Sequence, residues 1–281
     1  MTDSKQLTTS DIVEGSYSYM RSAAGPALIG IMIYAGMSSI GDYIRSAGIF
    51  GTSSTSIAAT IFLVMAVVWL AMAIRHGLGH PRKGIVGLAL GGDELRLCAS
   101  VFGFVAVLSI VLFLLGFAVF LLVMIVAAAA AGALSGEDVA EAELFLSPQA
   151  FNEFLSSGGT GAFVSVVGGG IIIAATALLI WLILRLLPFA AATIDQKRFV
   201  VLQAGAWTRH HDLALIFGGL LTIGVGMTFI FVARYAIAQM PFPTIAAALL
   251  AHIVSCFGAL LLIGFVCTVY IRLGQKAARP E

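Results

Sequence analysis

The stretch LCASVFGFVAVLSIVLFLLGFAVFLLVMIVAAAAAGALSG, Leu97 to Gly136, is a run of forty residues without a single charge. The hydrocarbon core of a bilayer is about 30 Å thick, so a helix needs about 20 apolar residues to cross it. At about 1.5 Å per residue, one helix over the whole run would reach about 60 Å. The run therefore indicates a membrane-spanning region, formed either by one long tilted helix or by two hairpinned spans.

The composition of the whole chain agrees with this class. Of the 281 residues, 60% are hydrophobic and only 10% are charged, whereas a soluble domain carries about 25% charged residues. The net charge of +1 provides no basic field that could recruit nucleic acid. The composition therefore excludes a soluble enzyme, a nucleic-acid binder and a disulfide-rich scaffold, and it indicates a polytopic membrane protein.

The three cysteines fit this class. Cys98, Cys256 and Cys267 lie in or beside apolar segments, their number is odd, and none belongs to a CxxC pair. We predict small, reduced apolar residues rather than bridges or zinc ligands. The N-terminus lacks an apolar run after Lys5, so we expect the first span, and not a cleaved signal, to direct insertion.

Further apolar segments of spanning length flank the central run. Together they predict an all-α fold, a polytopic membrane helix bundle of six transmembrane helices in a single integral membrane domain, 1–281. Within it, 1–22 is the cytoplasmic N-terminal segment, 135–160 an acidic outer loop and 272–281 a cytoplasmic tail. The predicted flanking spans are Ala23–Ile44, Ser56–Ile74, Gly161–Leu184, Leu213–Ala233 and Ile245–Ile271.

The distribution of Lys and Arg decides how many helices the central run forms. If it forms one, 13 of the 15 Lys and Arg share one side, and only Arg45 and Arg234 lie on the other. If it forms two, only six stay on the first side. Because cytoplasmic loops are enriched in Lys and Arg, we predict one long, tilted helix and both termini in the cytoplasm. We expect its end, 127–132, to emerge beyond the bilayer.

Amphipathic stretches precede the first, third and fifth spans on the predicted cytoplasmic side. Each mixes apolar or aromatic residues with a few charges. This pattern is typical of a helix that lies at the membrane interface before the chain turns into the bilayer. We predict interfacial elbow helices at Asp11–Arg21, Asp93–Leu97 and Arg198–Arg209, with Tyr17, Tyr19 and Trp207 at the headgroup level.

The stretch RLLPFAAATIDQKRFVVLQAGAWTRHHDLALIFGGLL, Arg185 to Leu221, leads from one span into the next. In this stretch a span ends in an Arg, and a Pro with small residues follows it. Next come a short charged turn and an amphipathic helix that ends in W-T-R. A second stretch, GGDELRL from Gly91 to Leu97, stands ahead of the third span. In these features the chain resembles the bacterial YciC-like proteins and the membrane domain fused to some glycerophosphodiester phosphodiesterases. The matching residues are Arg185, Pro188, Asp195, Lys197, Trp207, Thr208 and Arg209, with W-T-R shorter than the family's usual spacing.

This resemblance implies a six-helix protein of the bacterial inner (cytoplasmic) membrane and a link to membrane lipids. It does not imply phosphodiesterase activity, because no soluble segment of the chain is long enough to form that catalytic domain. The sequence also lacks GxSxG, P-loop, HExxH and dinucleotide motifs, and it lacks paired catalytic carboxylates. These observations lean against an enzyme, and they predict no cofactor.

Cations near the predicted cytoplasmic ends of the spans form the first candidate site. They could hold lipid phosphates, or they could only enforce topology and extend their charges to the interface. An unpaired charge near the hydrocarbon edge is costly, so we expect Glu94 and Asp195 to pair with some of them. This basic rim comprises Arg75, Arg82, Lys83, Arg96, Arg185, Lys197, Arg198 and Arg209, beside Trp207.

The second candidate is His252, an ionisable residue inside the sixth span. Such residues mark proton relays, ligand contacts or cofactor sites in membranes. Ligation of haem by two histidines is excluded, because no second histidine lies at membrane depth. The alternative is a structural role, in which His252 donates to a backbone carbonyl or to Thr222 or Thr228.

No metal site is predicted. His76 and His80 have the i, i+4 spacing of a helical chelate, but Gly77, Gly79 and Pro81 disfavour a helix there. The outer loop has no Lys or Arg and several carboxylates. A solvated loop, with 148–155 as a possible surface helix, is one interpretation of it, and a cation or partner site is the other.

Small residues recur every four positions on three spans, a pattern typical of close helix packing in membranes. The triple glycine Gly168–Gly170 could pack against another helix or break the fourth span. A broken helix lining a midplane cavity would favour a transporter. The stripes are Gly161, Ser165 and Gly169 on the fourth span, Gly218, Thr222 and Gly226 on the fifth, and Ala247, Ala251, Ser255 and Ala259 on the sixth.

Our leading hypothesis is a non-enzymatic membrane protein that interacts with membrane lipids, a membrane protein partner or a second copy of itself. The alternative is a small transporter or channel with a midplane cavity near His252. An enzyme acting on lipid headgroups is a third hypothesis, which requires one pocket that gathers the acidic and histidine residues of the cytoplasmic loops. Those residues are Asp93, Glu94, His210, His211 and Asp212.

Overall fold

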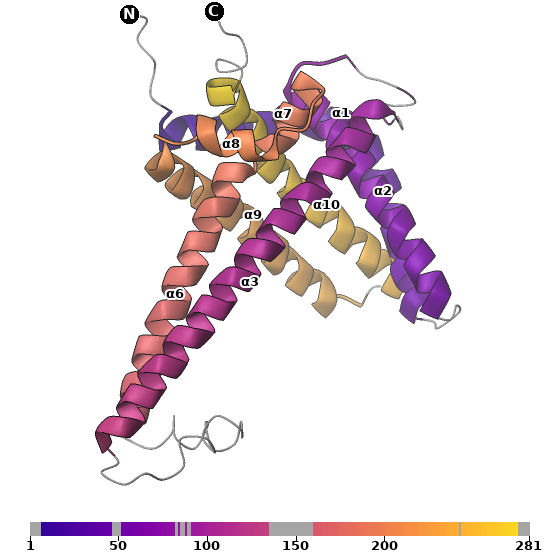
Figure 1. The fold of residues 1–281 in the computed structure, drawn as a ribbon. Helices are drawn as coiled ribbons and strands as arrows, with labels where there is room; N and C mark the ends of the chain where they lie inside the picture. Colours follow the sequence, from indigo (N-terminus) through magenta and orange to yellow (C-terminus); the bar gives the residue numbers. More distant parts are fainter. Residues whose placement is uncertain are drawn as a thin grey trace, which may run out of the picture. The chain divides into compact units, whose positions relative to one another are not determined.

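The computed structural model describes residues 7–46, 52–81, 84, 88, 91–134, 160–241 and 243–274. Within these residues the chain is helical and contains no β-strand, which confirms the predicted all-α class (Figure 1). The elements are α1 (Thr9–Ser46), α2 (Thr52–Gly77), α3 (Gly92–Leu134), α6 (Thr160–Leu186), α7 (Phe189–Gln196), α8 (Val201–Trp207), α9 (Asp212–Gln239), α10 (Thr244–Val269) and the π-helical turn η1 (Tyr270–Gly274).

Five stretches of the described helices are long and apolar enough to cross a membrane. Such helices suit hydrocarbon because they satisfy their own backbone hydrogen bonds. In α2 only a shorter apolar part, Leu63–Gly77, is found among the described residues. The sixth predicted span therefore stays a prediction. The five stretches are Thr9–Tyr43, Gly92–Leu122, Val166–Gln196, Asp212–Gln239 and Thr244–Gly274.

The long uncharged run forms one helix. α3 continues over 43 residues, from Gly92 to Leu134, so the hairpin alternative is wrong. A chain reversal inside the run would leave backbone N–H and C=O groups without partners in hydrocarbon. The run also contains neither Pro nor a charged residue that could begin a turn. The emergence of 127–132 beyond the bilayer stays a prediction.

The chain divides into two compact units. Unit 1 comprises Met1–Phe104 and Leu184–Glu281, and unit 2 comprises Val105–Ile183. The predicted single domain, 1–281, thus contains two units, which we describe separately. Unit 2 holds the distal parts of α3 and α6, whose large apolar side chains, such as Phe113, are exposed. Such surfaces suit lipid, because lipid tails are as apolar as the side chains themselves.

The triple glycine of α6 does not break the helix. α6 is continuous from Thr160 to Leu186, so the predicted alternative of a break at Gly168–Gly170 is wrong. A Cβ added to Gly169 or Gly170 would meet no neighbouring group within 4 Å among the described residues. The helix tolerates these glycines because its backbone hydrogen bonds do not depend on side chains. Packing of the glycines against another helix stays a prediction.

The core of unit 1 is built on α1, which packs mainly against α10. One face of α1 is buried along most of its length, at intervals of three or four residues that place side chains on one side of a helix. Because this stripe begins at Ile12, the predicted elbow Asp11–Arg21 belongs to the same helix, which also continues through Pro26. The buried residues are Ile12, Ser16, Tyr19, Ala23, Ala27, Ile31 and Ala35.

Of the three predicted elbows, the third has a helix of its own. Asp93–Leu97 lies in the first turns of α3, whereas Arg198–Arg209 contains the separate helix α8. α8 follows a sharp turn at Lys197, whose φ of 53° ends α7. Tyr19 is buried within the protein, and its hydroxyl donates to the Ala73 carbonyl at 2.7 Å. Its position at the headgroup level stays a prediction.

Glycine sets the distance between helices in unit 1. A Cβ on Gly264 of α10 would lie 2.7 Å from the backbone oxygen of Ser16 in α1, so this approach requires glycine. Gly226 of α9 and Gly258 of α10 also lie close, each near the carbonyl of the other. The stripe predicted on the fifth span therefore packs against neighbouring helices, with Gly218 facing Ile12 of α1 and Gly226 facing α10. On the sixth span the close approaches are made by Gly258 and Gly264, which lie outside the predicted stripe.

Candidate functional site

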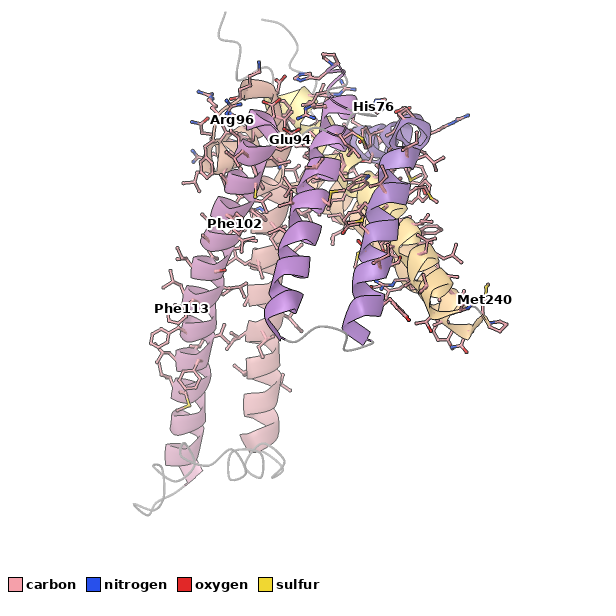
Figure 2. The ribbon with its side chains drawn as sticks, turned by 90° about the vertical axis from the view of Figure 1, so that its right-hand side faces the viewer. His76, Glu94, Arg96, Phe102, Phe113 and Met240 are labelled. Carbon is pink, nitrogen blue, oxygen red and sulfur yellow. The ribbon has the colours of Figure 1, made fainter. Side chains whose placement is uncertain are left out.

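The polar residues of unit 1 gather at one end, which we call the charged end. It is formed by the last turn of α2, the first turn of α3, the short helices α7 and α8, and η1 (Figure 1). Figure 2 shows Glu94 and His76 at this end and Met240 at the opposite end of the unit. Residues that are far apart in the sequence therefore meet here, and most of the predicted basic rim lies among them.

Arg75 is the centre of a buried charge cluster. Its guanidinium, in a residue only 3% exposed, donates to the Glu94 carboxylate and lies 3.7 Å from that of Asp93. Arg96 pairs with the other oxygen of Asp93 at 3.2 Å. The carboxylates also lie at the start of α3, where the helix dipole favours negative charge. Two cations and two anions thus balance one another, and Arg75 presents almost no surface to a ligand.

A second network surrounds Asp195, at the end of α7. Its carboxylate accepts a hydrogen bond from the Tyr270 hydroxyl at 2.7 Å and lies 3.0 Å from His80 Nε2. Gln196 donates to the Tyr270 oxygen at 3.2 Å, and Arg198 donates to Gln196 at 2.9 Å. The network ties α7 to η1 and to the turn after α2. Among the described residues the Asp195 carboxylate therefore contacts a histidine and a tyrosine outside the basic rim, so the predicted pairing of Asp195 with a rim cation is wrong for the described cations.

Arg185 holds the junction between α6, α8 and α9. Its guanidinium donates to the Gly205 carbonyl at 2.8 Å and lies 3.5 Å from the Asp212 carboxylate. The Thr208 hydroxyl donates to the Ala204 carbonyl at 3.1 Å and also accepts from Arg185 Nε at 3.4 Å. The start of the stretch that carries the family resemblance is thus joined by hydrogen bonds to α8 and the residue that follows it.

Exposed cations of the rim flank α8. Lys197, Arg198 and Arg209 are exposed and have no acidic partner among the residues that the structure describes. Between them α8 turns Val201 into the core and presents Leu202, which is 69% exposed. Positive charge and apolar surface are therefore combined on one short segment.

Three other residues of the predicted rim region are placed differently. Trp207 is partly buried, and its ring centroid lies 6.0 Å from that of Tyr270. It therefore packs partly against η1. Arg82 and Lys83 lie outside the described residues, as does most of the predicted outer loop 135–160 with its possible helix at 148–155.

A pocket of about 610 Å³ opens where α8 leads into α9. Free N–H groups at a helix start attract anions, Arg209 adds positive charge, and Leu213, which is 72% exposed, adds apolar surface. Burial lowers the pKa of His211 below its usual value, and His210 lowers it further while Asp212 opposes the change. The lining residues are Leu7, Arg209, His210, His211, Asp212, Leu213 and Ala214.

The enzyme hypothesis required five residues in one pocket. Three of them, His210, His211 and Asp212, line the pocket at the start of α9. The other two, Asp93 and Glu94, belong to the Arg75 cluster. The required group is therefore divided between two places in unit 1.

His252 has a partner that the sequence analysis did not single out. Its Nε2 lies 2.8 Å from a carboxylate oxygen of Asp42 on α1, and their side chains are 21% and 47% exposed. The antiparallel packing of α1 and α10 brings the pair together. Thr222, one of the partners considered above, is buried, and its hydroxyl has no hydrogen-bond partner among the described residues. Asp42 could have been identified as the single acidic residue in the first predicted span.

The histidines near the end of α2 do not share a helix. α2 ends at Gly77, and Gly79 has a φ of 71°, as the glycines between His76 and His80 had indicated. The described residues contain no group of three or more His, Cys, Asp or Glu that could hold a metal ion. The three cysteines are free thiols.

Comparisons with protein-family models, with curated proteins and with solved structures find no match for the chain. Its class follows from its own features, namely long apolar helices of spanning length and a charged end in unit 1. The chain is a helical, multi-pass membrane protein. The resemblance of Arg185–Leu221 to YciC-like proteins stays a prediction.

Proposed function

We propose that this protein is a non-enzymatic, lipid-interacting membrane protein that binds anionic phospholipid headgroups through its α8 segment, Lys197–Leu213. The observation that carries the proposal is the combination on this segment of exposed cations, a pocket at a helix start and exposed apolar side chains. An element that lies at a membrane interface needs both kinds of surface, because it contacts headgroups and acyl chains together.

The surroundings of the other cations support the choice of this segment. Arg75 is neutralised by buried carboxylates, and Arg185 is engaged by a carbonyl and by Asp212. Lys197 and Arg209 extend into solvent instead. A cation near an anionic membrane surface contributes about 1 kcal/mol to binding. The α8 segment is therefore the part of the charged end that is best suited to lipid phosphates.

The proposed topology has six spans, with the charged end and both termini at the cytoplasmic face of a bacterial inner membrane. α2 is the sixth span in this arrangement. The asymmetry of Lys and Arg in the sequence supports it, because anionic lipids and insertion both favour cations in the cytoplasm. The exposed Arg234, near the end of α9, lies on the other side.

The test measures binding of phosphatidylglycerol to the full chain in mild detergent. We expect the triple variant Lys197→Gln, Arg198→Gln, Arg209→Gln to bind at least tenfold more weakly, given about 1 kcal/mol per cation. The charge-preserving variant Lys197→Arg, Arg198→Lys, Arg209→Lys should bind like the wild type. The single change Arg234→Gln is the control for a cation elsewhere. Unchanged binding by the folded glutamine variant would overturn the proposal.

A second candidate function is proton-coupled transport. The specific observation is the Asp42–His252 pair, which joins two apolar helices at 2.8 Å. Paired Asp and His residues inside spans are typical of proton relays. In this proposal the pair binds and releases a proton as α1 and α10 change their contact.

Proton flux into liposomes that contain the full chain and a pH-sensitive dye tests this candidate. Under an imposed potential, we expect flux above that of protein-free liposomes, with both Asp42→Asn and His252→Gln returning it to background. A serine substitution at Thr228, another polar position in a span, serves as the control. Flux that is the same in the wild type and in both pair variants would exclude the candidate.

A further inference from the structure

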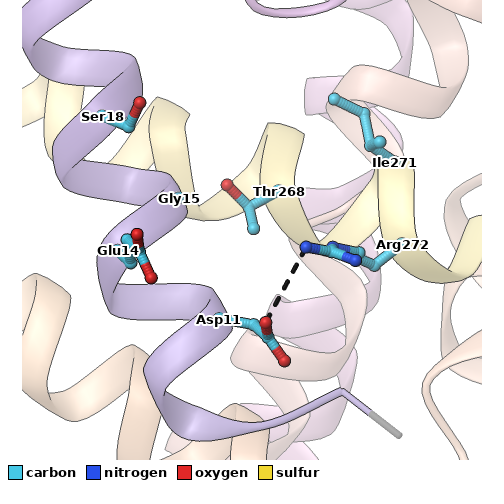
Figure 3. A pocket seen from close by; sticks show the side chains of 7 residues that line it. All are labelled: Asp11, Glu14, Gly15, Ser18, Thr268, Ile271 and Arg272. Carbon is cyan, nitrogen blue, oxygen red and sulfur yellow. Dashed lines mark ion pairs between the residues drawn. The ribbon is translucent and has the colours of Figure 1, made fainter. Parts of the chain in front are cut away.

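A second pocket lies at the charged end, between α1 and the end of α10 (Figure 3). Its volume is about 340 Å³, within the range of pockets for small ligands. The α1 residues that line it recur every three or four positions, and so do those of α10 and η1. Two helix faces therefore form its walls. The lining residues are Asp11, Glu14, Gly15, Ser18, Thr268, Ile271 and Arg272.

In the lining of the pocket, Gly15 of α1 faces the side chain of Thr268 of α10. A Cβ on Gly15 would lie 2.6 Å from the Thr268 hydroxyl oxygen, so the absence of a side chain at Gly15 leaves that hydroxyl accessible. The next part of the wall is η1, and π-helical turns frequently occur at functional sites. The residues that line this pocket differ from those that line the pocket at the start of α9.

The charges of the lining are only partly satisfied within the protein. One oxygen of Asp11 accepts from the backbone N–H and the hydroxyl of Thr8, at 3.0 Å and 2.7 Å, and so caps α1. The other oxygen lies 3.7 Å from an Arg272 nitrogen (Figure 3). Glu14 and Thr268 have no side-chain partner among the described residues. α1 thus offers the Glu14 carboxylate and the Ser18 hydroxyl, and the end of α10 with η1 offers the Thr268 hydroxyl and the Arg272 guanidinium.

We propose that this pocket binds a zwitterion with a primary ammonium and a phosphate, such as the phosphoethanolamine headgroup. Glu14 accepts hydrogen bonds from the ammonium, and Arg272 donates to the phosphate oxygens, as guanidinium groups do with planar or tetrahedral oxyanions. Ser18 and Thr268 supply hydroxyls between the two charges. The site is separate from the α8 segment and goes beyond the function proposed above.

The lining also discriminates between headgroups. A choline group has no N–H donor for Glu14, and quaternary ammonium groups are typically bound by aromatic rings, which are missing from this lining. An anionic headgroup without an ammonium meets two carboxylates and one cation, so repulsion disfavours it. The expected order of binding is therefore ethanolamine first, with choline and glycerol headgroups well below it.

The experiment uses the full chain in mild detergent and measures binding of phosphatidylethanolamine, phosphatidylcholine and phosphatidylglycerol in separate titrations. We expect Glu14→Gln and Arg272→Gln each to weaken binding of the ethanolamine lipid about tenfold, the usual effect of losing one charge-assisted hydrogen bond. Thr268→Val, which keeps the shape of the side chain, should weaken it less. The glutamine variant of the α8 segment should leave this binding unchanged.

Two further arms settle the source of the ligand and the independence of the two sites. If soluble phosphoethanolamine competes with the lipid, the pocket also binds the free zwitterion. If the lipid binds and soluble phosphoethanolamine does not compete, the ligand is the headgroup of a lipid. Either outcome supports the proposed pocket. Equal binding of choline and ethanolamine lipids, or unchanged binding by folded Glu14→Gln and Arg272→Gln proteins, would overturn it. Phosphatidylglycerol binding reports on the α8 segment alone, so the two proposals fail separately.

Discussion

Arg75 and Arg209 belong to the same predicted rim, but their surroundings are opposite. Arg75 lies between the carboxylates of Asp93 and Glu94 and is 3% exposed, whereas Arg209 is exposed beside a pocket. A buried charge needs a counter-ion, because the loss of hydration is otherwise not compensated. Burial thus separates cations that hold the fold from cations that can meet a ligand.

The Arg75 cluster leads to a prediction about stability. Arg75→Met leaves the Glu94 carboxylate buried without its cation, and we expect a loss of about 3 kcal/mol in the free energy of unfolding. The double variant Arg75→Met, Glu94→Leu removes both charges and should recover much of the loss. Denaturant unfolding of the purified protein in detergent measures both changes. A single variant as stable as the wild type would contradict the role assigned to the cluster.

The contact between α1 and α10 gives a second prediction at this scale. In Gly264→Ala the new methyl group meets the Ser16 backbone, which cannot move as a side chain can, so we expect a loss of about 1–3 kcal/mol. Gly224→Ala is the matched control, because its Cβ meets nothing within 4 Å among the described residues. Thermal unfolding should separate the two variants. Equal melting temperatures would refute the close approach at Gly264.

At the scale of elements, the turn that leads from α8 into α9 contains a histidine whose protonation is coupled to folding. The pKa of His211, in this turn, is lowered chiefly by burial. Between the lowered pKa and the usual histidine value of about 6.5, the unfolded chain binds more protons than the folded one. Stability therefore falls as the pH drops from about 6.5 through the lowered pKa of the folded protein.

This direction of the change in stability with pH leads to a prediction. We expect the melting temperature to fall as the pH drops below about 6.5, and we expect His211→Gln to reduce that fall because glutamine does not titrate. His76→Gln, which changes a histidine outside the turn, is the comparison. A slope that is identical in the wild type and in His211→Gln would show that His211 does not contribute to it.

The elements themselves differ in how far the sequence predicts them. α3 follows from its forty uncharged residues, because length and hydropathy alone require a helix in hydrocarbon. The elbow at Asp11–Arg21 was predicted as a separate helix, since polar residues there resemble an interfacial segment. In the structure the buried stripe continues from Ile12 to Ala35. Packing against α10, which the sequence does not reveal, keeps α1 in one piece.

At the scale of the whole molecule, the number of spans sets which surfaces face the cytoplasm. In a variant without the native cysteines, we expect cysteines at Ser4 and Ala277 to react with a membrane-impermeant reagent only from the cytoplasmic side. A cysteine at Ser156 should react only from the other side. If α2 does not cross, Ser4 and Ala277 will react from opposite sides, so the labelling of intact cells or oriented vesicles decides the sixth span.

The sequence by itself determined the membrane class and the helical fold, because both follow from local hydropathy and from the need of a backbone in lipid to satisfy its own hydrogen bonds. The continuity of α3 followed from the distribution of Lys and Arg along the whole chain. The sequence also identified His252 and the cations. The tertiary structure alone decided their partners, which are Asp42 for His252 and Glu94 for Arg75. It also placed Glu14 and Arg272 in the lining of one pocket. These pairings join residues far apart in the chain, and helix crossing, set at glycines such as Gly264, brings them together.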